Sequence, residues 1–161
     1  MTDVCDLPTT DADWREPVVI RRLLTTPATW AVVGLSNNRA RTAHGIARFV
    51  RDRLGMTIVP VHPRAETVDG APGFARLADI PTPGENGSPG PIEVVDCFVN
   101  SSRVGGIVDE AIANAERLGI RALWLQLGVI DVEAGVRARK AGLDVVMDTC
   151  PAIESPRLRL G

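Results

Sequence analysis

Short apolar runs alternate along this chain with segments whose apolar residues recur at helical spacing, and this alternation limits the possible folds more than any other feature. Each run has the length of a buried strand, and each intervening segment is amphipathic. Strands separated by helices pair in parallel, and right-handed crossovers then place helices on both faces of the sheet. We therefore expect an α/β fold with a doubly wound, mainly parallel five-stranded sheet. The predicted strands are 30–34, 57–61, 94–99, 122–125 and 144–147.

The segments around these strands carry helix signals. Gly55, Gly119 and Gly142 each follow a helical pattern at the position where a left-handed residue commonly ends a helix. Residues 75–80 are long enough for only one or two helical turns, and 82–91 form a loop rich in glycine and proline. The predicted helices are 18–24, 42–54, 104–118 and 132–141.

Composition and pattern divide the chain into three parts. Residues 1–16 hold five acidic side chains and one arginine, which is typical of a flexible tail. Residues 17–29 are expected to form an N-terminal helix and a connector, and residues 30–161 the main domain. Pro60 cannot donate a hydrogen bond to a neighbouring strand, so the second predicted strand should lie at a sheet edge or end near this proline.

Charge and composition exclude several classes of partner. The net charge is −2 and aromatic residues make up 4% of the chain, so neither a basic surface nor stacking platforms for nucleic acid are expected. No apolar run reaches the length of a membrane span, and the N-terminus is acidic, which predicts a cytoplasmic protein without membrane contact. Three cysteines at wide spacing indicate free thiols. His44, His62 and Cys150 do not have a metal-ligand spacing, and no metal site is assigned.

The first βα loop is the main candidate for ligand binding. In a doubly wound sheet, ligands bind beyond the carboxyl ends of the strands. Gly34, Leu35 and Ser36 follow the first predicted strand and lead to the start of the first crossover helix, whose free N–H groups and dipole favour a phosphate. Arg39 and Arg41 add two donors. The alternative is an ordinary turn with solvated arginines.

A dinucleotide fingerprint is absent from this loop. The pattern GxGxxG would require glycines where Ser36 and Arg39 stand. An NAD site would also have an acid at the end of the second strand, but the residues there are His62, Pro63 and Arg64. A cation at this position suits a phosphate on the ribose, as in NADP or coenzyme A.

From Trp30 to Leu158 the chain resembles the small stand-alone coenzyme A-binding proteins of bacteria and archaea, which are related to the CoA-binding domain of the succinyl-CoA synthetase α subunit. Six motifs occur in the order typical of that family, which makes the resemblance specific. It implies a Rossmann-like domain that binds coenzyme A at the strand ends. The motifs are Ala31–Ser36, Ile58–Arg64, Val95–Phe98, Leu123–Val129, Gly142–Cys150 and Ile153–Glu154.

The resemblance also assigns roles to individual residues. Gly34, Leu35 and Ser36 would form the phosphate loop, and His62, Pro63 and Arg64 would flank the adenosine. Phe98 and Val99 would contact the adenine or the pantetheine. Gln126 would line the far wall of the binding site. The sequence differs from the family pattern in four places. His62 stands where the family usually has Asn, Ala43 where Ser is common, and Thr149 where Arg is common, and the loop around Gly87 is an insertion.

The function implied is non-catalytic binding of coenzyme A or acyl-CoA, as a sensor or carrier. No catalytic residue is assigned. The alternative is a nucleotide-dependent enzyme, either an NADP oxidoreductase or a component of an acyl-CoA ligase. The missing glycine fingerprint argues against the first and the missing active-site histidine motif against the second. Helix 18–24 offers a face to a second copy of the chain, so a homo-oligomer is compatible with the pattern.

The cysteines and the last acidic residue have simpler interpretations. Cys97 lies within a predicted strand and is expected in the core. Cys150 follows the last strand, on the ligand side, where a buried and inert thiol is the commoner case. Glu154 is expected to form a surface ion pair with Arg157 or Arg159.

Three aspartates and one tryptophan are expected to have structural roles. Asp96, Asp144 and Asp148 are interpreted as polar caps at strand ends, because no nucleophile–base pair accompanies them. Trp124 lies within an apolar run and is expected in the core.

Overall fold

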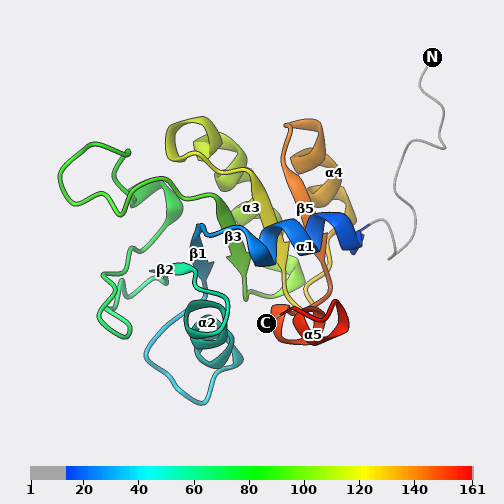
Figure 1. Ribbon diagram of the computed structural model, residues 1–161. Helices are drawn as coiled ribbons and strands as arrows, with labels where there is room; N and C mark the ends of the chain where they lie inside the picture. Colours follow the sequence, from blue (N-terminus) through cyan, green and yellow to red (C-terminus); the bar gives the residue numbers. More distant parts are fainter. Residues whose placement is uncertain (1–13, 161) are drawn as a thin grey trace.

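The computed structural model describes residues 14–160 and contains one sheet of parallel strands in the order β2-β1-β3-β4-β5. The first strand, β1, is an inner strand; the chain adds β2 on one side of it, at the edge, and then crosses to its other side for β3 (Figure 1). This order confirms the doubly wound, Rossmann-like prediction and puts the switch in winding direction between β1 and β3. The strands are β1 Thr29–Val33, β2 Thr57–Val61, β3 Val94–Cys97, β4 Ala122–Leu125 and β5 Asp144–Met147.

Helices cover both faces of the sheet, as predicted. One core cluster packs α3, α4 and η3 on the first face, and a second packs α1 and α2 on the other, where α5 contacts both of these helices (Figure 1). The helices are α1 Pro17–Thr25, α2 Thr42–Asp52, η3 Leu77–Asp79, α3 Ser101–Leu118, α4 Val132–Lys140 and α5 Pro151–Arg157.

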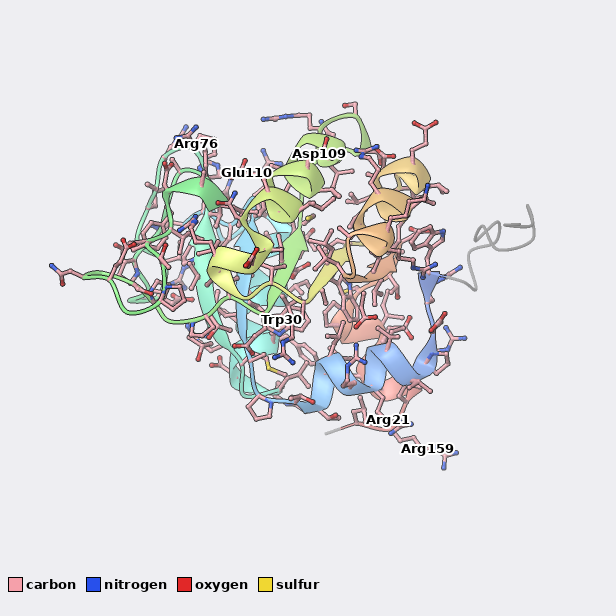
Figure 2. The ribbon with its side chains drawn as sticks, turned by 90° about the horizontal axis from the view of Figure 1, so that it is seen from above. Arg21, Trp30, Arg76, Asp109, Glu110 and Arg159 are labelled. Carbon is pink, nitrogen blue, oxygen red and sulfur yellow. The ribbon has the colours of Figure 1, made fainter. Side chains whose placement is uncertain are left out.

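The centre of the second cluster is a pair of tryptophans. Trp30 of β1 and Trp124 of β4 are both fully buried, and their ring centroids are 5.8 Å apart. Figure 2 shows Trp30 in the interior, beside α1. The indole of Trp124 donates a hydrogen bond to the carbonyl of Thr149, at 2.9 Å, which ties β4 to the start of the C-terminal segment. Trp124 is therefore a core residue, as predicted.

Strand β2 forms one edge of the sheet, as its proline predicts. Pro60 is buried in the strand, and its carbonyl accepts a hydrogen bond from Phe74 N–H at 3.0 Å. His62 N–H donates to the carbonyl of Phe74 at 2.9 Å. The segment after β2 thus returns along this edge and covers part of it, and the crossover to β3 contains the single-turn η3 as its helical element.

One residue of the stretch expected to be a flexible tail lies in the core. Residues 1–13 of that stretch fall outside the described part of the chain, but Trp14 is only 3% exposed. A Cβ atom at Gly135 would lie 2.6 Å from the Trp14 ring, so a glycine in α4 makes room for it. The guanidinium of Arg139 lies over the same ring, 3.8 Å from its centroid.

The C-terminal helix α5 was not predicted, and it changes the interpretation of Glu154. Pro151 begins the helix at a position where proline is well tolerated. The helix turns Glu154 inward, where it is 3% exposed and accepts a hydrogen bond from the Thr149 hydroxyl. Arg157 lies 3.9 Å from the other carboxylate oxygen. The predicted ion pair of Glu154 with Arg157 is therefore present, but its location at the surface is wrong for the carboxylate, which is buried.

Within residues 14–160, no helix has the length and hydropathy needed to cross a membrane.

Candidate functional site

The carboxyl ends of β1, β2 and β3 meet at Gly34. Its N–H donates to the carbonyl of Val61 at 2.7 Å, and a Cβ atom at this position would lie 2.6 Å from the carbonyl oxygen of Phe98. Its φ of +100° is in the range that favours glycine. Gly34 therefore allows the backbones of three strand ends to approach closely at the switch point, where doubly wound sheets bind their ligands.

The loop after Gly34 is organised by its own side chains. Ser36 Oγ accepts a hydrogen bond from Asn38 N–H at 3.2 Å, and Asn38 Oδ1 accepts one from Ala40 N–H at 3.0 Å. Asn37 donates to the carbonyl of Thr67 at 2.9 Å, which ties the loop to the segment after β2. These bonds fix the path of the chain into α2.

No side chain caps the N-terminus of α2, within the described residues. Its N-cap residue, Arg41, has an extended backbone and makes no capping hydrogen bond. The first N–H groups of a helix have no partner inside the helix, and the helix dipole makes this end positive. The start of α2 is therefore suited to an anionic group such as a phosphate.

Three arginines near these strand ends are available to a ligand. Arg39, Arg41 and Arg64 are exposed, and none forms a side-chain hydrogen bond or ion pair with the part of the chain that the structure describes. Arg64 lies in a tight turn in which His62 Nδ1 accepts its N–H at 3.2 Å and His62 O accepts the N–H of Ala65 at 2.7 Å. Pro63 between them is exposed. This turn fixes the backbone from which the Arg64 side chain leaves.

The remaining predicted contacts differ in how accessible they are. Phe98 and Val99 directly follow β3 and are half-buried, and they pack on opposite faces of the sheet. Leu35 is 1% exposed, so its side chain belongs to the core and mainly its backbone is available to a ligand. Gln126 directly follows β4 and is 4% exposed.

Gln126 forms a buried pair with Asp96. Its side-chain amide donates to Asp96 Oδ1 at 2.5 Å, while Asp96 Oδ2 has no hydrogen-bond partner in the described chain. Asp96 lies inside β3 and is fully buried, so its interpretation as a strand-end cap is wrong. Burial raises the pKa of the Asp96 carboxyl to about 7, and the hydrogen bond from Gln126 opposes this shift in part.

The other two aspartates lie at the ends of β5, as predicted. Asp144 begins the strand and forms an ion pair with Arg22 of α1. Asp148 follows it with a φ of +61°, and its Oδ1 accepts a hydrogen bond from Gly128 N–H at 2.7 Å. This bond joins the loops after β4 and β5.

Both described cysteines are buried. Cys97 is fully buried in β3, and burial raises the pKa of its thiol. Cys150 is the N-cap of α5 and is 7% exposed. Burial also raises the pKa of the Cys150 thiol, although hydrogen bonds from the N–H groups of Ala152 and Ile153 act in the opposite direction. The thiolate is the reactive form, so neither cysteine is activated.

This burial predicts slow thiol modification in the native protein. In a Cys5→Ser variant, used to leave Cys97 and Cys150 as the remaining thiols, we expect an aromatic disulfide reagent at pH 8 to react at least about tenfold more slowly with native than with urea-unfolded protein. Release of the coloured thiol measures the rate. Fast native labelling that is lost in Cys150→Ser would contradict the prediction and show an activated Cys150.

A hairpin beside the site was missed by the sequence analysis. Val68 and Ala71 exchange backbone hydrogen bonds of 2.9 Å around Asp69 and Gly70, both of which have positive φ. Asp-Gly between two short extended segments is the usual signal for such a turn. The segments on either side of this turn are too short to show a strand pattern, so the sequence does not predict the hairpin.

Among residues 14–160, no group of three His, Cys, Asp or Glu side chains is placed to hold a metal ion.

Proteins similar to this chain in sequence and in structure are known. The chain is 29% identical over 131 residues to the uncharacterized protein YneT of Bacillus subtilis (strain 168), which covers 81% of this chain and 87% of YneT. A hypothetical protein from Pyrococcus horikoshii OT3 has a similar structure, with a TM-score of 0.77 and 30% identity over 94% of this chain and 98% of that one.

A larger protein shares the fold alone. The dinucleotide-forming acetyl-coenzyme A synthetase 1 of Ca. Korarchaeum cryptofilum matches 77% of this chain with 26% of its own, at a TM-score of 0.58 and 21% identity. The family model described as "CoA binding domain" matches residues 28–156, which is most of the chain. The chain therefore belongs to the family of CoA binding domains.

Proposed function

We propose that this protein binds coenzyme A or an acyl-CoA at the carboxyl ends of β1, β2 and β3 and catalyses no reaction on it. The observation that carries the proposal is the arrangement at the switch point. The segments that follow β1 and β2 carry a glycine turn, an uncapped helix N-terminus and three arginines whose side chains make no hydrogen bond or ion pair with the described chain. In a chain of the CoA-binding family, these are the groups that a phosphorylated nucleotide requires.

The residues present fit the charged parts of coenzyme A. The pyrophosphate would accept hydrogen bonds from backbone N–H groups of the loop after Gly34 and from the start of α2, with Arg39 and Arg41 nearby. The ribose phosphate would lie against Arg64, at the end of β2. Ala43 in the first turn of α2 has no hydroxyl to add. Backbone and arginine donors would therefore carry most of the phosphate binding.

The absence of catalysis is supported by the environment of the nucleophiles near the strand ends. Cys150 is buried and its thiol has a raised pKa. The Thr149 hydroxyl donates to Glu154, and both side chains are buried, at 2% and 3% exposure. A nucleophile needs an adjacent base and access to the substrate. These groups lack the access.

Isothermal titration calorimetry with coenzyme A tests the binding. We expect saturable binding of one molecule per chain, and unchanged thiol and thioester content when acyl-CoA is incubated with the protein. No heat and no thermal shift at millimolar coenzyme A would overturn the proposal. Turnover of acyl-CoA or of a reduced nicotinamide would instead favour an enzyme.

The role of Arg64 can be tested with a ligand that lacks the ribose phosphate. We expect coenzyme A to bind about ten- to a hundredfold more tightly than dephospho-coenzyme A, because a guanidinium–phosphate contact contributes roughly 1.4–2.8 kcal/mol when partly solvated. Calorimetry on Arg64→Ala should show that most of this difference is lost.

Arg39→Ala and Arg41→Ala are the matched controls. If these arginines contact the pyrophosphate, their removal weakens both ligands and leaves the ratio unchanged. Equal affinities of the unaltered protein for the two ligands would show that Arg64 is a solvated charge.

A further inference from the structure

A cavity of about 320 Å³ lies beside the edge strand, apart from the strand ends. It is bounded by α2, by the amino-terminal half of β2 and by the hairpin at Val68–Ala71. Met56, Thr57 and Ile58 line it, and these residues are at the opposite end of β2 from the turn at His62. Most of the cavity therefore lies away from the site proposed for coenzyme A, although the two adjoin at Leu35 and at the first turn of α2, which carries His44.

The inner wall of the cavity is apolar. Its side chains belong to the second core cluster and are at most 9% exposed. A wall of this kind favours an aliphatic or aromatic group over water, because apolar surface gains free energy when it leaves water. The wall residues are Leu35, Ala47, Met56, Ile58 and Val68.

One polar side chain in this wall lacks a hydrogen bond. His44 of α2 is 4% exposed and lines the cavity, yet its imidazole forms no hydrogen bond with residues 14–160. Asp69 Oδ2 is 3.7 Å from His44 Nε2, which is longer than a hydrogen bond. An imidazole on the wall of a pocket that makes no hydrogen bond within the described chain can form one with a polar group of a ligand.

The charges around the cavity limit what that partner can be. Arg51 is already neutralised, with Asp52 at 2.8 Å and Asp69 at 3.5 Å. Arg48 also lines the cavity and has no hydrogen bond or ion pair within the described chain. The lining holds two guanidiniums, Arg48 and Arg51, and one carboxylate, Asp69, which fits a ligand with one negative charge. Asp52 beside Arg51 would repel a second negative charge.

We propose that this cavity binds a small monocarboxylate with an apolar tail. The carboxylate would accept hydrogen bonds from Arg48 and from the His44 imidazole, and the tail would lie against Leu35, Met56 and Ile58. The volume is at the lower end of the range for ligand sites, which fits a tail of about four to eight carbon atoms. This inference does not depend on the binding of coenzyme A.

Hexanoate is a suitable probe, followed by amide chemical shifts in a two-dimensional NMR titration of the full chain. We expect saturable shifts on α2 and on the hairpin at Val68–Ala71, with a dissociation constant on the order of 1 mM for so small a ligand. 1-Hexanol has the same tail without the charge and should bind about tenfold more weakly. Hexanol binding as tight as hexanoate would overturn the assignment of an anion site.

Two variants and one control variant test the residues that line the cavity. Arg48→Gln should weaken hexanoate binding about tenfold, whereas Arg53→Gln, directly after the same helix and outside the cavity, should leave it unchanged. Ala47→Leu would fill the cavity and should abolish the shifts, and the spectrum itself reports whether the variant is folded. Equal effects of the two arginine variants, or no saturable binding to the unaltered protein, would overturn the proposal.

Experiments with coenzyme A distinguish a failure of this proposal from a failure of the function proposed above. A saturating amount should not displace hexanoate, and Ala47→Leu should keep its affinity for coenzyme A. Failure of hexanoate binding with intact coenzyme A binding would reject the cavity alone. Competition between the two ligands would overturn the claim of a separate site.

Discussion

Gly34→Ala is expected to lower the free energy of unfolding by about 3 kcal/mol or more and to abolish coenzyme A binding. The left-handed backbone at φ +100° costs an alanine roughly 1–2 kcal/mol. The added Cβ would also lie 2.6 Å from the carbonyl oxygen of Phe98, so the ends of β1 and β3 must separate. Urea unfolding measures the stability and calorimetry the binding.

Gly55→Ala is the matched control, because it separates backbone strain from the steric clash. Gly55 has a similar φ of +77°, but no atom lies within 4 Å of the Cβ that alanine would add. We expect a loss of about 1 kcal/mol and unchanged binding. An equal loss of stability in both variants would show that the close approach to Phe98 contributes nothing.

Asp96→Asn is expected to stabilise the protein at pH 8 and to have little effect at pH 4. The carboxyl has a pKa of about 7 in the folded protein, whereas the ordinary pKa of an aspartate, which applies in the unfolded chain, is 3.8. The folded state therefore holds a proton that the unfolded state has lost between these pH values, and stability falls as pH rises through this window. At about 1.4 kcal/mol per pKa unit, the charged Asp96 costs up to about 4 kcal/mol above pH 7. Asparagine removes this cost.

Urea unfolding at pH 4, 6 and 8 measures the effect. The gain for Asp96→Asn over the unaltered protein should grow between pH 4 and pH 7 and then level off, because groups other than Asp96 contribute equally to both proteins. Asp109→Asn is the control, since Asp109 is 59% exposed and should change stability by less than about 0.5 kcal/mol at each pH. A gain for Asp96→Asn that is independent of pH would contradict the prediction.

Local pattern accounts for the parts of the fold that were predicted. A buried strand needs a continuous apolar run, and a helix on one face of a sheet needs an apolar stripe, and both are visible within a few residues. Because strands and helices alternate along the chain, the strands pair in parallel and the helices lie on both faces of the sheet. The strand ends, and with them Gly34, His62 and Phe98, could therefore be located from the sequence. The helix α5 was missed because it is too short to show a period.

The α/β class, the five strands and the loops at their carboxyl ends follow from periodicities within single segments, so they could be predicted from the sequence. The burial of a polar side chain depends on contacts between distant segments, so it became visible with the folded chain. Asp96 meets Gln126, which directly follows the neighbouring strand β4, and His44 lines a pocket bordered by a hairpin 25 positions further along, at Asp69. The local sequence around an aspartate or a histidine is the same whether its side chain is exposed to water or buried in the core. Its surroundings set its charge and its available partners.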